Sequence, residues 1–142
     1  MAGKLLKYND ISDDLNVLSG QIVDCAFQVH KELGAGFLES NYEEAFIIEL
    51  KRKNLKFEQQ ETHKIKYKEG FLNSVFRFDL IVENSILIEL KAVETIHPVH
   101  QAQIYAYLKA TNLPLGLLIN FNVPLIKHGI GRYVLRNSAS PR

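Results

Sequence analysis

A short apolar hairpin constrains the fold of this chain more than any other feature. Residues 76–82 and 85–93 are rich in Ile, Val, Leu and Phe, the composition of strands that are buried in a sheet. Glu83-Asn84, between the two segments, predicts a two-residue turn. The pattern therefore predicts two strands that run back along each other.

Besides Arg77, three charged side chains interrupt this apolar hairpin: Asp79, Glu89 and Lys91. Side chains two apart on a strand share a face, so Glu89 and Lys91 point the same way. The turn brings Asp79 on the first arm near Glu89 on the second. A charge buried on an apolar strand is costly unless it is paired or binds a metal ion. Alone, the three are equally consistent with an exposed ion pair that does nothing.

Length and composition indicate one globular domain over residues 1–142, with a core at about 13–136 and frayed ends at 1–11 and 137–142. The single cysteine, Cys25, excludes an internal disulfide framework and a cysteine-based zinc site. No run of eighteen apolar residues is present and the N-terminus lacks the apolar segment of a secretory signal. We expect a cytoplasmic protein with no membrane partner.

The net charge of +1 is low for a protein that binds nucleic acid, which often has a clearly basic domain. Its Lys and Arg residues are nevertheless clustered. The clusters are residues 51–53 with Lys56; His63, Lys64, Lys66 and Lys68; and Lys127, Arg132, Arg136 and Arg142. Taken singly, each cluster is more consistent with a solvated face than with a binding surface.

Two helices are predicted at the start of the core. Ser12 is a good N-cap, and an apolar stripe with three- and four-residue spacing extends from Leu15 to Leu33, before Gly34. The run Ser40-Asn-Tyr-Glu43 reads as a capping box that opens a second helix, which ends at about Asn54. Its expected buried side consists of Ala45, Phe46, Ile48 and Leu50.

The remaining elements complete the order α-α-β-β-β-β-α-β-β, a mixed sheet flanked by helices. Strands are predicted at 55–60, 62–68, 75–82, 85–93, 115–121 and 132–136, with a turn at Glu69-Gly70. His97-Pro98 opens a third helix that reaches about Thr111. This helix makes the connection between the strands at 85–93 and 115–121 a right-handed crossover between parallel strands.

The hairpin charges suit the hydrolysis of a phosphodiester. Mg²⁺ takes oxygen ligands, usually one or two carboxylates with substrate phosphate and water. Asp79 and Glu89 supply two carboxylates, and the carbonyl of Leu90 offers a third oxygen. Lys91 can orient or deprotonate the attacking water and stabilise the negative charge of the transition state. His97 and His100 are three apart, but the break at Pro98 argues against a shared metal.

Asp79 followed by Glu89-Leu-Lys91 resembles the signature of the PD-(D/E)XK nuclease superfamily, although Phe78 replaces the proline of its name. Gln103-Ile-Tyr-Ala-Tyr107 resembles the Q-x-x-x-Y motif of its RecB-like and Cas4-like branch. Gly36-Phe-Leu-Glu39-Ser-Asn-Tyr42 is similar to the motif of the GxxExxY protein family, which is assigned to this superfamily. The resemblance extends from about residue 15 to residue 121.

The resemblance implies a restriction-endonuclease-like α/β core and a role for each matching residue. Asp79 and Glu89 correspond to metal ligands, Lys91 to the catalytic lysine, and Glu39 to a helix carboxylate that holds or positions the metal, often through water. Gln103 and Tyr107 share one helix face and correspond to residues that contact substrate phosphate or orient the lysine. The motif's Gly36 and Tyr42 are expected to shape the turn before the helix.

We therefore expect a nuclease that depends on Mg²⁺ or Mn²⁺ and acts on DNA rather than RNA. A structure-selective endonuclease similar to junction resolvases is the second interpretation, and it requires a homodimer. The third is a non-catalytic module that keeps the fold to bind nucleic acid or to complete a larger complex.

Overall fold

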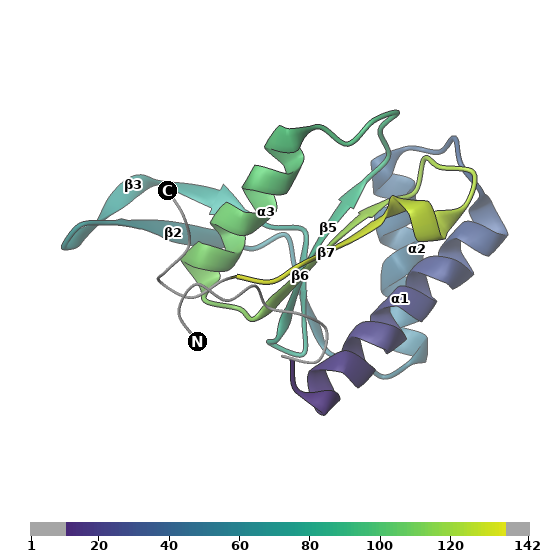
Figure 1. Cartoon of the computed structure of the whole chain (residues 1–142), viewed down its shortest axis with the longest axis horizontal. Coiled ribbons are helices and arrows are strands. Elements are labelled where there is room, and N and C mark those ends of the chain that lie inside the picture. The colour runs from purple at the N-terminus through teal and green to yellow at the C-terminus, as the bar shows by residue number, and fades with distance from the viewer. Residues whose placement is uncertain (1–10, 136–142) are drawn as a thin grey trace.

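The computed structural model describes residues 11–135, which form a five-stranded mixed sheet with helices on both faces and a separate two-stranded ribbon (Figure 1). The α/β class and the sheet flanked by helices were predicted correctly. In chain order the elements are α1 (Asp13–Leu33), α2 (Glu39–Arg52), β1 (Phe57–Gln59), β2 (Thr62–Tyr67), β3 (Gly70–Arg77), β4 (Leu80–Val82), β5 (Ile86–Lys91), α3 (Pro98–Thr111), β6 (Leu115–Asn120), the 3-10 helix η2 (Ile126–Gly129) and β7 (Ile130–Tyr133).

The five strands lie in the order β1-β4-β5-β6-β7. Only β5 and β6 are parallel; the other neighbouring strands are antiparallel. Helix α3 connects the two parallel strands, as the sequence predicted, and every residue of β6 is buried. Strand β7 begins two residues before its predicted start at Arg132 and ends at Tyr133. Arg136, the predicted end of this strand, lies outside the described residues.

Two hydrophobic cores lie on opposite faces of the sheet. Side chains of Ile86, Ile88 and Leu90 in β5 pack into the core with α1 and α2. Leu87 of the same strand packs into the core that includes Ile104 of α3. Side chains alternate between the faces of a strand, so the odd-numbered residues Glu89 and Lys91 lie on the α3 face.

Helix α1 matches its prediction. Ser12 is the N-cap, and its Oγ accepts a hydrogen bond from the Leu15 N–H at 3.2 Å. Gly34 ends the helix with a φ of 68°, in the left-handed region that glycine adopts most easily. Ile11, predicted to be frayed, is buried and accepts a hydrogen bond from the Asn16 side chain. The other residues predicted as frayed, 1–10 and 137–142, lie outside the described residues.

Helix α2 begins at Glu39, one residue before the predicted cap at Ser40. The N-cap is Leu38, and its N–H donates to Asn41 Oδ1 at 3.0 Å, so the predicted Ser40–Glu43 capping box is wrong. Asn54 has a φ of 59°, a left-handed residue just after the helix, and so cannot continue it. The side chain of Ile48 is 54% exposed and is not part of the core.

Tyr42 fixes the loop between the first two helices. Its ring is fully buried and stacks on Phe121 of the sheet, with ring centroids 4.6 Å apart. The Tyr42 hydroxyl donates to the Gly34 carbonyl at 2.6 Å and accepts from the Phe37 N–H at 3.1 Å. Between these residues Gly36 has a φ of 109°. The predicted shaping role of Gly36 and Tyr42 is therefore confirmed, and it holds Glu39 at the start of α2.

We expect Tyr42→Phe to lower the free energy of unfolding by about 1–3 kcal/mol, because it leaves the Gly34 carbonyl and Phe37 N–H without their partner. Urea denaturation measures the change. Tyr105→Phe is the matched control. Because Tyr105 is 43% exposed, removing its hydroxyl group should change the free energy of unfolding by about 0.5 kcal/mol or less. Equal stability of Tyr42→Phe and the wild type would contradict this role.

The predicted hairpin is confirmed in the sheet, but its first arm is divided. Only β4 pairs with β5, and residues 70–77 form β3, which pairs with β2 in the ribbon. The chain turns between β4 and β5 over three residues, 83–85, because Val82 pairs with Ile86. The ribbon's own turn is at Lys68-Glu69, one residue earlier than predicted.

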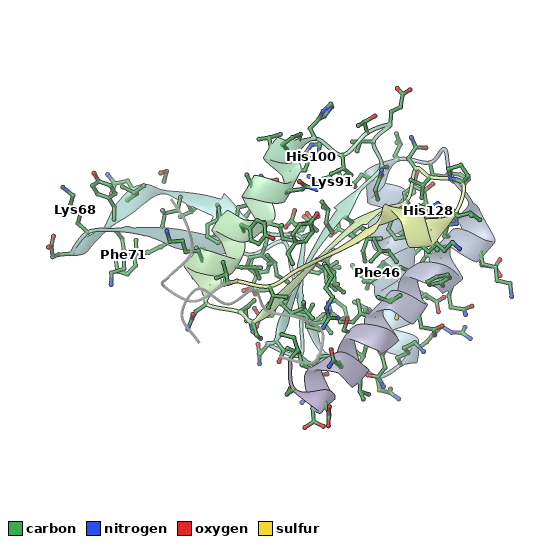
Figure 2. All side chains as sticks on the ribbon, in the orientation of Figure 1. Phe46, Lys68, Phe71, Lys91, His100 and His128 are labelled. Carbon is green, nitrogen blue, oxygen red and sulfur yellow. The ribbon has the colours of Figure 1, made fainter. Side chains whose placement is uncertain are left out.

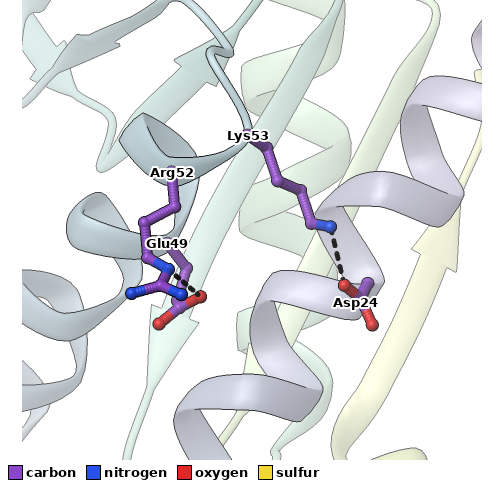
Figure 3. A network of polar contacts seen from close by, with 4 residues as sticks. All are labelled: Asp24, Glu49, Arg52 and Lys53. Atoms are coloured by element: carbon purple, nitrogen blue, oxygen red, sulfur yellow. Dashed lines mark ion pairs between the residues drawn. The ribbon is translucent and has the colours of Figure 1, made fainter.

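Surface ion pairs involve part of the basic cluster at residues 51–53 (Figure 3). Lys53 Nζ lies 2.7 Å from Asp24 Oδ2 of α1, and Arg52 Nε lies 3.9 Å from Glu49 Oε1. The hydrogen bond from Lys53 lowers the pKa of the Asp24 carboxyl. The Lys53–Asp24 pair therefore joins α1 to the end of α2, whereas the Arg52–Glu49 pair lies within α2.

Candidate metal centre

The candidate site lies where the pairing of β4 with β5 stops. The last pair in the ladder is Leu80 with Ile88. Beyond it, the Leu90 N–H donates to Asp79 Oδ2 at 2.8 Å, and the Asp79 N–H donates to Glu89 Oε1 at 3.2 Å. The Asp79 carboxylate therefore accepts the hydrogen bond that a backbone carbonyl of a paired strand would accept from the Leu90 N–H. This places Asp79 beside Glu89, as predicted.

Two backbone contacts stop the ladder at this point. The Phe78 N–H donates to the Glu61 carbonyl at 3.3 Å, and the Gln60 N–H donates to the Asp79 carbonyl at 2.8 Å. The segment between β3 and β4, which contains Asp79, thus turns its backbone toward the β1–β2 connection and away from β5. This leaves room for a side chain beside Leu90.

The Leu90 carbonyl points toward the same opening. In an extended strand the N–H and C=O of one residue point to the same edge. The Leu90 N–H points toward Asp79, whereas the Lys91 carbonyl accepts from the Phe121 N–H on the opposite edge, at 2.9 Å. The Leu90 carbonyl oxygen is thus directed to the side of the strand where Asp79 lies.

The two carboxyl groups strongly influence each other. Burial, followed by the charge of Asp79, raises the pKa of Glu89 from 4.5 to about 8. Burial also raises the pKa of Asp79, while the hydrogen bond from the Leu90 N–H acts in the opposite direction. A side-chain hydrogen bond links the two groups. Without a cation, the pair therefore retains a proton above the usual pKa of a carboxyl group.

Lys91 lies on the same face of β5 as Glu89 and is half-buried. Its charge lowers the pKa of both Asp79 and Glu89, but less than burial raises it. Figure 2 shows Lys91 close to His100 in the first turn of α3. Burial and then the charge of Lys91 lower the pKa of His100, whose Nδ1 accepts from the His97 N–H at 3.0 Å.

Helix α2 brings two more carboxylates toward the site. Glu39 is exposed at the first turn, and its pKa is raised first by desolvation and then by the charge of Asp79. Glu43, one turn later, is only 8% exposed. Its carboxylate accepts from the side-chain amides of Gln59 at 3.2 Å and Gln60 at 2.9 Å. The charge of Glu43 contributes to the raised pKa of Asp79.

Sequence reasoning missed Glu43, which it assigned to a capping box. The available signal was its position four residues after Glu39, which places both carboxylates on one face of the helix. The neighbouring glutamines gave no signal, because their contact with Glu43 depends on how β1 packs against α2.

Helix α3 supplies the predicted Gln103 and Tyr107 pair. Gln103 Nε2 donates to Tyr107 Oη at 2.7 Å, and both side chains are half-buried. The Tyr107 ring stacks on Phe76 of β3, with centroids 4.5 Å apart. Burial and then the charge of Glu89 raise the pKa of the Tyr107 hydroxyl. The Gln103–Tyr107 pair thus borders the carboxylates, on the α3 face of the sheet.

Asn120 holds the segment that follows Lys91, a role that no sequence pattern indicated. Its side chain is 2% exposed and lies opposite Lys91 in the β5–β6 register. Its Oδ1 accepts from the N–H groups of Val93 at 3.0 Å and Asn122 at 3.3 Å. Its Nδ2 donates to the Val93 carbonyl at 2.9 Å. The chain therefore leaves the site in a fixed direction.

We expect Asn120→Ala to lower the free energy of unfolding by about 1–3 kcal/mol, because the partly buried N–H and C=O of Val93 lose their partners. Asn122→Ala is the control, since only the backbone N–H of Asn122 takes part in this network. Urea denaturation of the two variants measures the difference. Equal stability of the two variants would show that Asn120 does not fix this segment.

The residues fit a hard divalent cation that takes part of its coordination from outside the protein. Asp79, Glu89 and the Leu90 carbonyl offer oxygen atoms at one opening. Within residues 11–135, no three side chains of His, Cys, Asp or Glu are close enough to hold a metal ion by themselves. This suits Mg²⁺, which usually keeps several waters and binds substrate phosphate.

The fold and the paired carboxylates beside a lysine define a restriction-endonuclease-like α/β protein. Residues 16–133 match the PD-(D/E)XK nuclease superfamily, and the chain belongs to this superfamily. Its nucleases generally use divalent metal ions, and their fold implies a nucleic-acid substrate. Searches of curated proteins and of solved structures gave no match.

Among the helices of residues 11–135, none has the length and apolar composition needed to cross a membrane.

Proposed function

We propose that this protein is a nuclease that hydrolyses phosphodiester bonds of DNA and depends on Mg²⁺ or Mn²⁺. The observation that carries the proposal is the pair of adjacent carboxyl groups at the opening of the β4–β5 ladder, with Lys91 on the same face. The match to the PD-(D/E)XK nuclease superfamily supports the same reaction.

Asp79, Glu89 and the Leu90 carbonyl would hold the metal ion. When bound, a divalent cation neutralises charge on the phosphodiester and lowers the pKa of a water molecule. Lys91 orients the attacking water and stabilises the negative charge that develops on the phosphate. Glu39, exposed at the start of α2 and near enough for the charge of Asp79 to raise its pKa, would act on the site through water.

Gln103 and Tyr107 would position the substrate. Their mutual hydrogen bond presents an amide and a hydroxyl next to the carboxylates. These are suitable donors for phosphate oxygens. The pair also supports assignment to the RecB-like and Cas4-like branch, and Glu39 with Tyr42 supports assignment to the GxxExxY family. The first of these relationships favours DNA over RNA.

Cleavage assays test the proposal. Linear duplex DNA, single-stranded DNA, branched DNA and RNA are incubated with purified protein in Mg²⁺, Mn²⁺ and EDTA. We expect cleavage of DNA in the presence of either metal and none in EDTA. Asp79→Ala should abolish it, whereas Glu44→Gln, an exposed carboxylate on α2, should retain it. Absence of cleavage of every substrate, or cleavage that survives Asp79→Ala, would refute the proposal.

The same assays separate the two alternative interpretations. Selective cleavage of branched DNA by a homodimer, measured by light scattering, would favour a structure-selective endonuclease similar to junction resolvases. Binding of DNA without cleavage would favour a non-catalytic module. The intact set of Asp79, Glu89 and Lys91 favours catalysis, because all three side chains that the reaction requires are present.

A further inference from the structure

The ribbon formed by β2 and β3 projects from the body of the protein, beyond α3 (Figure 1). Strand β3 has eight residues, about 26 Å at the usual rise of a strand. All but two of the side chains in the two strands are exposed; Ile65 and Phe76 are half-buried. The ribbon therefore contributes little to either core and has most of its surface available for contact.

Positive charge is concentrated on this ribbon. Lys64, Lys66, Lys68 and Arg77 lie between residues 62 and 77, and Glu69 is the only acidic residue there. The whole chain has a net charge of only +1, so the remaining residues are together slightly acidic. Among residues 11–135, no ion pair involves any of the ribbon's basic side chains. A local basic surface is the electrostatic requirement for binding a polyanion.

Most of this charge is on one face. Thr62 pairs with Arg77 and Lys64 with Val75, so these side chains share a face of the ribbon. The register shifts between Lys64 and Lys66, and beyond the shift Lys66, two residues after Lys64 on β2, pairs with Phe71, whose ring centroid lies 6.0 Å from Lys64 Nζ. His63 and Phe76 pair on the other face, where Phe76 stacks on Tyr107 of α3. The face with Lys64, Lys66 and Arg77 is therefore the one turned away from α3.

Large aromatic side chains accompany the lysines near the end of the ribbon. Phe71 is 64% exposed and Tyr67 is 60% exposed. Lys64 Nζ lies 6.0 Å from the centroid of the Phe71 ring, and Lys68 Nζ lies 5.5 Å from that of Tyr67. Figure 2 shows Lys68 and Phe71 at the far end of the ribbon. Exposed aromatic rings beside lysines are typical of surfaces that stack unpaired bases while binding phosphates.

The other basic clusters are less suitable for this role. Lys53 and Arg52 form ion pairs with acidic side chains. The Arg132 guanidinium donates to Ser19 Oγ at 3.0 Å and to Asn16 Oδ1 at 2.7 Å, both in α1. Arg136 and Arg142 lie outside the described residues. Within residues 11–135, by contrast, no acidic or amide partner is found for any basic side chain of the ribbon.

The base of the ribbon leads directly into the candidate metal centre. Arg77 ends β3 two residues before Asp79, and Phe76 is stacked on Tyr107, which borders the carboxylates. On the same face as Phe76, the His63 ring lies 5.4 Å from the Phe76 ring. Because Arg77 is on the basic face, a strand of nucleic acid along that face would reach Asp79 where the ribbon joins the sheet. The contacts of Phe76 lie on the other face, where they hold the base of the ribbon against α3.

We propose that the β2–β3 ribbon binds a single-stranded segment of the substrate, with Lys64, Lys66 and Lys68 on its phosphates and Phe71 stacked on a base. This inference rests on the proposed nuclease function for the identity of the substrate. Duplex DNA is not the ligand, because its bases are already stacked on each other and leave no face for Phe71.

Fluorescence anisotropy in EDTA measures binding separately from cleavage. The probe is a labelled 20-nucleotide single strand, and the test variant combines Lys64→Gln, Lys66→Gln and Lys68→Gln. Its matched control combines Lys31→Gln, Lys51→Gln and Lys127→Gln, exposed lysines elsewhere with the same loss of charge. We expect the ribbon variant to bind at least about tenfold more weakly, with a salt slope shallower by about 2. The control should stay within about twofold of the wild type.

Phe71→Ala tests the stacking contact. We expect it to weaken single-strand binding at least about fivefold with little change in the salt slope, because no charge is lost. Phe27→Ala, which removes a 43% exposed ring on α1, is the matched control and should bind like the wild type. Replacing the three ribbon lysines with arginine should retain binding, which separates charge from folding.

Three results would overturn the inference. The ribbon variant and its lysine control could lose the same binding affinity, or Phe71→Ala could bind like the wild type. The third is tighter binding to duplex DNA than to single strands. Failure of the proposed function is a separate result. If no substrate is cleaved in Mn²⁺ but the ribbon variants lose binding in EDTA, the ribbon inference holds and the nuclease proposal fails. If DNA is cleaved but the ribbon variants bind it normally, only the ribbon inference fails.

Discussion

Lys91→Ala is expected to slow DNA cleavage by about 100- to 1000-fold while leaving Mn²⁺ binding intact. Lys91 is on the same face of β5 as Glu89, and it is not one of the oxygen groups that would hold the ion. Loss of one group that stabilises the charge of a transition state typically slows a reaction by this factor. Single-turnover cleavage and isothermal titration with Mn²⁺ measure the two effects.

Two comparisons make this expectation specific. Lys109→Ala removes an exposed lysine near the end of α3 and should cleave DNA at the wild-type rate. Asp79→Ala should lose both cleavage and Mn²⁺ binding, so the lysine and the carboxylate differ in the second measurement. Wild-type cleavage by Lys91→Ala would remove the lysine from the mechanism.

The metal-free protein is expected to become less stable as the pH rises from 5 to 8. The pKa of Glu89 is raised to about 8 in the folded protein, against 4.5 for the ordinary group. Between these values the folded chain keeps a proton that the unfolded chain has lost, so the free energy of unfolding falls with rising pH. The expected slope is about 1.4 kcal/mol per pH unit while this difference persists. Urea denaturation in EDTA at several pH values measures it.

Glu89→Gln should remove most of this pH dependence and make the metal-free protein more stable at pH 8, because the amide is neutral at every pH. Glu44→Gln should keep the wild-type profile, since it replaces an exposed carboxylate outside the pair. Mn²⁺ should restore stability at pH 8 more than at pH 5, because ionised carboxylates bind the cation. A wild-type protein that gains stability between pH 5 and 8 in EDTA would contradict the coupled carboxyl pair.

The elements with a clear local signal were predicted well. Ser12 and Gly34 mark the ends of α1, and the continuous apolar run of β6 indicated a strand buried on both faces. The start of α2 was misplaced by two residues, because its N-cap is Leu38, whose N–H donates to the Asn41 side chain, and not Ser40. Several side chains can satisfy the free N–H groups of a first turn, and the sequence does not decide which one does.

The division of the first hairpin arm had no local signal. Residues 76–82 are apolar almost without interruption, but the chain leaves the ribbon at Arg77 and joins the main sheet at Leu80. Contacts of Phe78 and Asp79 with the connection after β1 set this boundary. They join segments distant in sequence, and strand periodicity does not report such contacts.

The candidate site was predicted where two strands determine it. The spacing of Glu89 and Lys91 on β5 and the return of the chain at residues 83–85 were enough to place Asp79 beside Glu89. Glu43 and Asn120 were missed because their roles depend on contacts between elements distant in sequence. Glu43 of α2 binds a glutamine of β1, and Asn120 of β6 binds the chain that follows β5. The role of the ribbon depends on its projection from the sheet, which composition does not reveal.

Anomalous diffraction from crystals soaked in Mn²⁺ shows whether the carboxyl pair holds a metal ion. We expect one ion at the opening of the β4–β5 ladder, contacting carboxylate oxygens of Asp79 and Glu89 and the carbonyl oxygen of Leu90. Crystals of Asp79→Ala treated in the same way should show no ion there. A wild-type crystal without an ion between these carboxylates, in the presence of millimolar Mn²⁺, would contradict the assignment of this site as a metal centre.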